Sequence, residues 1–259
     1  GCLCGKQQVR TGRIVGGHDA YDGEFPWIVS VHADFLERHE CGGTIVAKRW
    51  IVTAAHCLQR CIFCSRTILR QGSYHQIAYN HSYATDTCVI SIYLKFRLLP
   101  QFRFEVKLLP VASSLYYTKI NSKLQNHCFI DKNGPAQDER CTLVVGLSSM
   151  KEVPSYMTDV LQKVDVRIMS NIQCNGLYSE ADKSIRVARE QLCAGHKEGK
   201  KDACTGDSGG PLMVREGKKY VVIGVVSGGI GCARPLLPGL YTRIASYMPW
   251  ILSHLRNDR

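Results

Sequence analysis

The sequence has no long hydrophobic run and no repeated or low-complexity segment. No apolar stretch approaches the roughly 18 residues that a transmembrane helix needs, so the chain is predicted not to span a membrane. The absence of repeats excludes solenoid and array architectures. The chain has 259 residues, of which 45% are hydrophobic and 21% charged, which is typical of a soluble globular protein with one or two compact units.

Aromatic residues are missing where positive charge is densest. The segment 183–201, KSIRVAREQLCAGHKEGKK, is the most basic stretch of a chain whose net charge is +11, and it contains no Phe, Trp or Tyr. A nucleic-acid groove interleaves aromatic side chains with basic ones, so no nucleic-acid partner is expected. A solvated basic surface is the favoured interpretation, and attraction to polyanions such as sulfated glycans is the alternative.

Most of the thirteen cysteines lack metal-ligand spacing. The CIFC pair at 61–64 has no second pair of its kind, which favours loop disulfides or free thiols over a zinc or redox centre. No metal and no cofactor are therefore expected. Disulfides indicate an oxidising compartment, so the protein is predicted to be secreted and extracellular. The first residues, GCLCGKQQVR, lack a charged start followed by an apolar core, and a signal peptide is expected to have been removed or never included.

Strand patterns outnumber helical ones. The β-branched stretches 42–55 and 218–229 are bounded by glycine and predict strands. One late segment differs, because four apolar residues recur there at helical spacing: Met248, Ile251, Leu252 and Leu255. With Ser246 as cap and Pro249 in the first turn, this pattern predicts a terminal helix that packs one face on the core.

The stretch DACTGDSGGP, residues 202–211, places Ser208 between an acid and two glycines. A serine hydroxyl is a poor nucleophile at neutral pH and needs a neighbouring base, usually histidine. His56 is the best candidate among the nine histidines because it follows a predicted strand in WIVTAAHCL. A histidine in such a place is more often structural, so its interpretation depends on the combination with Ser208.

Three motifs together resemble the trypsin-like serine endopeptidases of the secreted zymogen type: RIVGG at 13–17, TAAHC at 53–57 and GDSGGP at 206–211. The resemblance extends from Ile14 to the terminal helix and is weak over residues 58–140. It implies an all-β fold of two antiparallel six-stranded β-barrels, with the active site between them and a C-terminal helix. The implied organisation is an activation leader over 1–13 and a peptidase domain over 14–259, divided into barrels at about 14–115 and 125–245 and a helix at 246–256.

The resemblance assigns roles to the serine, the histidine and their surroundings. Ser208 is the implied nucleophile, His56 the implied base, and the backbone N–H groups of Gly206 and Ser208 the implied oxyanion hole. Asp202 is similar to the acid at the bottom of a pocket for substrate Arg or Lys. Gly229 and Gly239 match the pocket-wall glycines that leave room for that long side chain.

The second acid of the stretch, Asp207, has a different implied partner. Cleavage of the Arg13–Ile14 bond would release an α-amino group at Ile14, and the resemblance pairs this group with Asp207. A buried carboxylate without a partner is costly, so cleavage would act as a switch.

The third catalytic residue is the weakest part of the resemblance. The strand that should begin with an aspartate reads CVISIYLK, and the expected position falls on Cys88 or Val89. Neither can orient an imidazole. Asp86 is the nearest acid and is the predicted third member, although it needs a bulge because a one-residue slip turns a strand side chain to the other face. Two of the family's tryptophans are also replaced, by Gly228 and Val145.

Cysteine pairing and glycosylation are predicted only in part. The family-like disulfides are Cys41–Cys57, Cys174–Cys193 and Cys204–Cys232. Seven cysteines remain unassigned: Cys2, Cys4, Cys61, Cys64, Cys88, Cys128 and Cys141. The sequon NHS permits a glycan at Asn80 without requiring one.

Two functions remain open at this stage. The favoured one is an active endopeptidase, predicted to be a monomer. It cuts protein or peptide substrates after Arg or Lys once an activating protease has cleaved Arg13–Ile14. The alternative is a catalytically weak homologue that acts as a binding partner or cofactor. The first is favoured because His56, Ser208, Gly206, Asp207 and Asp202 are all present.

Overall fold

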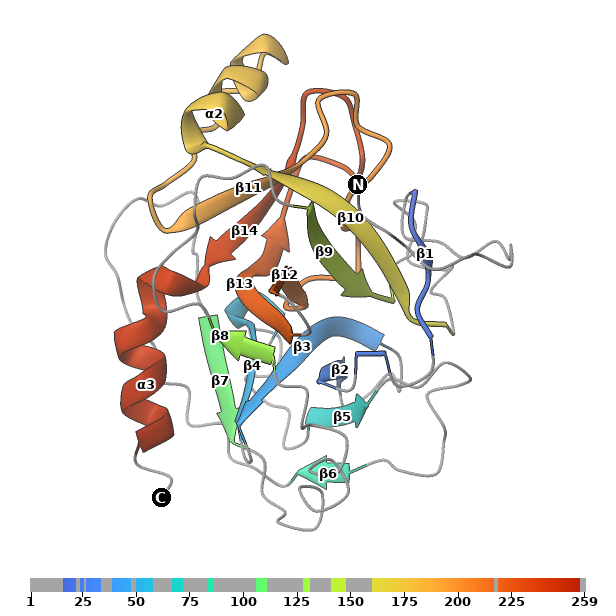
Figure 1. Ribbon diagram of the computed structural model, residues 1–259, viewed down its shortest axis with the longest axis vertical. Helices are drawn as coiled ribbons and strands as arrows, with labels where there is room; N and C mark the ends of the chain where they lie inside the picture. Colours follow the sequence, from blue (N-terminus) through green and yellow to red (C-terminus); the bar gives the residue numbers. More distant parts are fainter. Residues whose placement is uncertain are drawn as a thin grey trace.

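The β-branched stretches form strands, and these strands build two sheets stacked one above the other (Figure 1). The computed structural model describes residues 16–21, 24–25, 27–33, 39–47, 50–57, 67–71, 83–85, 106–110, 128–130, 141–147, 160–216 and 219–256. The predicted all-β class with a terminal helix is confirmed.

The six-stranded sheet comes from the first half of the chain. Its strands are β2 (Ile28–Ala33), β3 (His39–Ala47), β4 (Trp50–Ala54), β5 (Thr67–Gln71), β6 (Tyr83–Thr85) and β7 (Val106–Pro110). They lie in the order β6-β5-β2-β3-β4-β7, and all neighbouring pairs are antiparallel. The central strands β3 and β4 lie next to the eight-stranded sheet, so their ends can contribute to a site between the sheets.

The eight-stranded sheet contains a closed barrel. Its strands are β1 (His18–Asp19), β8 (Cys128–Ile130), β9 (Cys141–Gly146), β10 (Gln162–Met169), β11 (Gln191–Gly195), β12 (Pro211–Glu216), β13 (Lys219–Gly228) and β14 (Gly239–Arg243). They lie in the order β1-β10-β11-β14-β13-β12-β9, and β9 also pairs with β10. That pairing closes six strands into a barrel, with β1 added at β10 and β8 added in parallel at β13.

The helices lie at the edges of these sheets. Helix α2 (Asn171–Glu180) begins with a capping box, in which Ser170 and Gln173 satisfy each other's backbone N–H groups. A 3-10 turn, η2 (Ile244–Tyr247), leads directly into α3 (Met248–Arg256). Ser246 therefore lies inside η2, and the prediction that it caps the terminal helix was wrong. No helix within the described ranges is long and apolar enough to cross a membrane.

The hydrophobic core joins both sheets to α3. One buried cluster includes Val29 and Ile51 of the six-stranded sheet, Met213 and Val225 of the eight-stranded sheet, and Ile251 of α3. Burial of such apolar side chains is the main favourable term in folding. Because the core is shared, the two sheets are held in a defined relation, and so are the loops between them.

Three aromatic contacts, two edge-to-face and one tilted, reinforce this junction. Phe25 and Trp27 both precede β2, and their rings lie 5.5 and 5.7 Å from the ring of Tyr220 on β13, measured between centroids. The indole Nε1 of Trp27 also donates to the Sδ atom of Met213 at 3.2 Å. Buried aromatic pairs of this kind add about 0.5–1.5 kcal/mol beyond their area.

Candidate active site

A cavity of 740 Å³ lies where the two sheets meet. The six-stranded sheet contributes β3 and the residues that follow β4, and the eight-stranded sheet contributes the loop between β11 and β12 and the ends of β13 and β14. The cavity lining contains most of the predicted site residues: His56, Asp202, Gly206, Ser208, Gly229 and Gly239. These residues are separated by up to 183 positions in the sequence, and the fold brings them to one opening.

His56 sits in a short turn directly after β4 and is exposed to the cavity. The disulfide between Cys41 and Cys57 fixes this turn to β3, with a Cα–Cα distance of 6.0 Å. Partial removal from solvent lowers the pKa of His56 below the usual histidine value. A neutral imidazole at pH 7 can accept a proton, which is the state a general base requires.

One ring nitrogen of His56 and the sulfur atoms of Cys41 and Cys57 lie within 4.8 Å of one another. This spacing alone could hold a metal ion. The two sulfurs are bonded to each other, however, so neither is the thiolate that would bind one. The group is therefore a disulfide against which the imidazole packs.

Ser208 lies in a tightly hydrogen-bonded turn between β11 and β12. Its carbonyl oxygen accepts from the N–H of Gly42 on β3 at 2.8 Å, which ties this turn to the six-stranded sheet. The flanking backbone is held to β13, because Gly209 donates to the carbonyl of Val226 at 2.8 Å and Val226 donates to that of Gly210 at 2.9 Å. Ser208 is thus presented from a backbone that is anchored on both sides.

Two glycines of this turn have conformations that other residues avoid. Gly206 has φ +99° and Gly209 has φ +85°, both in the region that favours glycine. At Gly209 space is also excluded, since a Cβ would lie 2.2 Å from Oγ1 of Thr53 and 2.4 Å from the carbonyl oxygen of Gly42. The GDSGG pattern therefore reflects the backbone path around Ser208 as well as its chemistry.

His39 supports the same turn from β3. It is buried, with Nδ1 2.6 Å from Oγ of Ser30 and Nε2 2.8 Å from the carbonyl oxygen of Gly206. A carbonyl can only accept, so Nε2 donates, and in the neutral ring Nδ1 accepts from the Ser30 hydroxyl. The sequence analysis missed His39, because nothing in the stretch HECGG distinguishes it from the other histidines.

Asp202 lines the cavity and is only 3% exposed. Its Oδ2 atom accepts from the N–H of Ala233 at 3.1 Å, whereas Oδ1 has no hydrogen-bond partner within the described part of the chain. Burial raises the pKa of Asp202 to about 7. A buried carboxylate oxygen without a partner is costly, and a cationic group entering the cavity would remove that cost.

The two predicted wall glycines differ in their surroundings. A Cβ on Gly239 would lie 2.7 Å from Oδ1 of Asp202, so any side chain there would collide with the carboxylate. At Gly229 the nearest atom to a Cβ is 3.6 Å away, which is ordinary contact distance. Gly239 is therefore required by the position of Asp202, whereas Gly229 lines the open part of the cavity.

Asp207 is fully buried behind the Ser208 turn. Its Oδ2 atom accepts from the N–H of Cys204 at 2.8 Å. A Cβ on Gly146, at the end of β9, would overlap Oδ1 of Asp207 at 1.9 Å. Gly146 is thus the residue that leaves room for this carboxylate, and the sequence analysis did not single it out.

Comparison with known proteins agrees with this geometry. The family model described as Trypsin matches residues 14–251. The chain is also 35% identical over 257 residues to human testisin (Homo sapiens), an alignment that covers 96% of this chain and 79% of that protein. The chain belongs to the trypsin family of serine proteases.

The three disulfides that this family resemblance implied are present in the protease. Besides Cys41–Cys57, they are Cys174–Cys193 and Cys204–Cys232, with Cα–Cα distances of 6.2 and 5.3 Å. The first of these two joins α2 to β11, and the second joins the Ser208 loop to the loop after β13. The cysteines of Cys41–Cys57 and Cys204–Cys232 line the cavity, whereas Cys174–Cys193 lies outside its lining.

Several predicted residues of the protease lie outside the described residues. These are Arg13 and Ile14 of the activation site, the acid Asp86, the sequon residue Asn80, and Cys2, Cys4, Cys61, Cys64 and Cys88. Cys128 and Cys141 belong to β8 and β9, but their side chains are not described. The roles given to these residues stay predictions.

Proposed function

We propose that this serine protease is an endopeptidase that cleaves after Arg or Lys. The observation that carries the proposal is Asp202, which lines the same cavity as His56 and Ser208 and whose buried Oδ1 has no hydrogen-bond partner among the described residues. A guanidinium or ammonium group reaching into this cavity would supply the missing hydrogen-bond donors. The absence of side chains at Gly229 and Gly239 leaves room for it.

In the proposed mechanism, the hydroxyl of Ser208 attacks the substrate carbonyl. His56 takes the hydroxyl proton and then gives it to the leaving amine, as a base of lowered pKa can do at neutral pH. The N–H groups of Gly206 and Ser208 stabilise the oxyanion of the tetrahedral intermediate. Asp86 orients the imidazole. Water then hydrolyses the acyl-enzyme by the same steps.

The protease is further proposed to be made as a zymogen, with residues 1–13 as its activation leader, and to act outside the cell. Cleavage of Arg13–Ile14 by an activating protease would create the α-amino group that pairs with Asp207. This fits an acid that is fully buried beside the Ser208 turn, because a cationic group nearby would offset part of the cost of burying its charge. The disulfides support an extracellular location.

The test compares fluorogenic amides ending in Arg, Lys, Phe and Leu, using protein cut at Arg13. We expect hydrolysis of the Arg and Lys substrates, and a loss of orders of magnitude in that hydrolysis for Asp202→Ser. Fluorophosphonate labelling of Ser208 should survive in Asp202→Ser and disappear in the matched control Ser208→Ala. A preference of the unmodified protein for Phe or Leu would contradict the assignment of Asp202.

A second candidate is a catalytically weak homologue that acts as a binding partner. It is favoured by the sequence CVISIYLK, which places Cys88 or Val89 where the orienting acid is expected. Loss of that acid lowers turnover by about ten-thousandfold in related triads. Absence of fluorophosphonate labelling in cut protein that still binds benzamidine would favour this candidate.

A further inference from the structure

The segment that follows the activation site lies along β10 with very few backbone contacts. Strand β1 is only two residues long, and it pairs His18 with Lys163 and Asp19 with Gln162. One more backbone bond follows, from the N–H of Ala20 to the carbonyl of Leu161 at 2.8 Å. A ladder of two residue pairs at the edge of a sheet is a weak restraint on its own, because so few backbone hydrogen bonds hold the segment in place.

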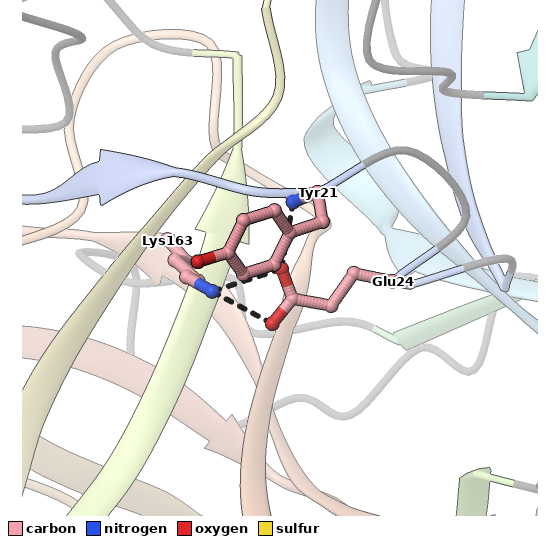
Figure 2. A network of polar contacts seen from close by, with 3 residues as sticks. All are labelled: Tyr21, Glu24 and Lys163. Atoms are coloured by element: carbon pink, nitrogen blue, oxygen red, sulfur yellow. Dashed lines mark hydrogen bonds and ion pairs between the residues drawn. The ribbon is translucent and has the colours of Figure 1, made fainter. Parts of the chain in front are cut away.

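Side chains add a second restraint at the far end of this segment. Nζ of Lys163 donates to Oε1 and Oε2 of Glu24 at 2.7 and 2.8 Å and lies 4.7 Å from the ring centroid of Tyr21 (Figure 2). The same carboxylate accepts from the backbone N–H of Tyr21 at 2.7 Å. The Lys163 and Glu24 side chains are 21% and 22% exposed. We call these three residues, Tyr21, Glu24 and Lys163, the β10 clamp.

The β10 clamp lies next to Gln162, whose strand partner Gly146 faces Asp207. Gln162, the neighbour of Lys163, pairs with Asp19 on one side of β10 and with Gly146 of β9 on the other. Its Nε2 atom also donates to Oδ1 of Asp19 at 2.8 Å. Gly146 is the residue whose missing side chain leaves space for the Asp207 carboxylate. The position of β1 on β10 is therefore set relative to Asp207.

At its other end the segment passes close to the loop that leads to Asp202. Gly16 has φ +71°, and a Cβ there would lie 2.4 Å from the carbonyl oxygen of Lys200 and 2.8 Å from Cγ of Lys201. Gly16 is two residues after Ile14. The described residues of this segment are thus held at Gly16 by close packing and at Tyr21 and Glu24 by the β10 clamp.

From this geometry we infer that Lys163 is a positioning residue for activation. By holding Glu24 and Tyr21, it fixes the register of residues 18–20 on β10, so that the α-amino group of Ile14 reaches Asp207 after cleavage. The inference rests on the proposed function, which supplies the pairing of Ile14 with Asp207. It predicts that breaking the β10 clamp weakens that pairing without changing the cavity residues.

The test measures how fast cyanate carbamylates the Ile14 amine in protein cut at Arg13, read by mass spectrometry of the Ile14 peptide. A buried, ion-paired amine reacts only when the segment opens, so the rate reports the opened fraction. We expect Lys163→Met and Glu24→Gln each to raise the rate about three- to tenfold, because a partly buried ion pair with an added ring contact is lost. The double variant should match the single variants, and Lys163→Arg should stay near the parent.

Two controls separate this effect from general destabilisation. Lys197→Met removes an exposed ion pair with Glu180 on α2, and Ile251→Val lowers the melting temperature through the core of α3. Neither should change the rate by more than about twofold at 25 °C. Equal rates in the β10 clamp variants and the parent, or an equal rise in Ile251→Val, would overturn the role of Lys163.

The parent protein tests the proposed activation in the same experiment. Its Ile14 amine should react at least about tenfold more slowly than a free peptide beginning IVGG, as expected for a buried ion pair. Absence of this protection would contradict the pairing with Asp207, and the role of Lys163 would fall with it. Protection in the parent without an effect of the variants would leave the proposed function standing and overturn only the inference.

Discussion

Nε2 of His39 donates to the carbonyl oxygen of Gly206 at 2.8 Å, across 167 positions of sequence. This bond joins β3 of the six-stranded sheet to the peptide unit that precedes Asp207 in the eight-stranded sheet. Gly206 is also the residue proposed to supply one oxyanion N–H group. The orientation of that residue therefore depends on a side chain from the other sheet.

The first prediction is that His39→Ala lowers kcat/KM about ten- to a hundredfold. Leaving a buried carbonyl without its donor costs about 1–3 kcal/mol, and the turn around Gly206 can relax to recover it. Benzamidine affinity should change little, because benzamidine binds beside Asp202. Ser30→Ala is the control that keeps the Nε2 donor and should have a smaller effect. A lower melting temperature with unchanged kcat/KM would make His39 purely structural.

The second prediction concerns activation. Arg13→Gln should prevent cleavage by trypsin and keep the protein inactive towards an Arg amide, whereas limited trypsin treatment of the parent should raise hydrolysis. The α-amino group that the proposed function pairs with Asp207 forms only when the Arg13–Ile14 bond is cut. Full activity in a preparation that is intact at Arg13 would refute this mechanism.

The third prediction follows from the pKa of about 7 for the Asp202 carboxyl. Burial raises this pKa, so the carboxyl becomes neutral as the pH falls below about 7 and loses its attraction for a cation. Benzamidine affinity should decrease about tenfold between pH 8 and pH 6. Asp202→Ser should bind weakly at both values, without this pH dependence. Titration by fluorescence or calorimetry measures the effect, and a flat profile for the parent would count against it.

The fourth prediction distinguishes the two wall glycines. Gly239→Ala places a Cβ 2.7 Å from Oδ1 of Asp202 and should abolish benzamidine binding by displacing the carboxylate. Gly229→Ala meets nothing closer than 3.6 Å and should keep most of it. Both variants should retain fluorophosphonate labelling at Ser208. Equal benzamidine affinities in the two variants would show that the carboxylate moves freely.

The fifth prediction concerns the third catalytic acid. Asp86→Asn should leave benzamidine binding unchanged and lower turnover by about three to four orders of magnitude, because the imidazole loses its orienting carboxylate. Normal turnover in Asp86→Asn would reduce Asp86 to a loop residue. Replacing Cys88 or Val89 by Asp, one at a time, would then identify the lost position by a large gain in turnover.

The sequence by itself determined the fold class, the family and the main candidates for the cavity. This was possible because the decisive information is local: TAAHC and GDSGGP are contiguous, and two of the three glycines of the second motif, Gly206 and Gly209, have the positive φ that a tight turn requires. The four apolar residues of the terminal helix likewise follow a simple period. The cap at Ser246 was predicted wrongly because Ser246 lies inside η2, the 3-10 turn that precedes α3.

Only the tertiary structure decided which distant residues support the site. His39 with Gly206, Gly146 with Asp207, and Lys163 with Glu24 are each separated by at least 61 positions, and no local pattern marks any of them. Their partners are selected by strand order and register, which place β3 against the Ser208 turn and β1 and β9 on either side of β10. Register depends on pairing between strands, and a motif within one strand carries no information about it.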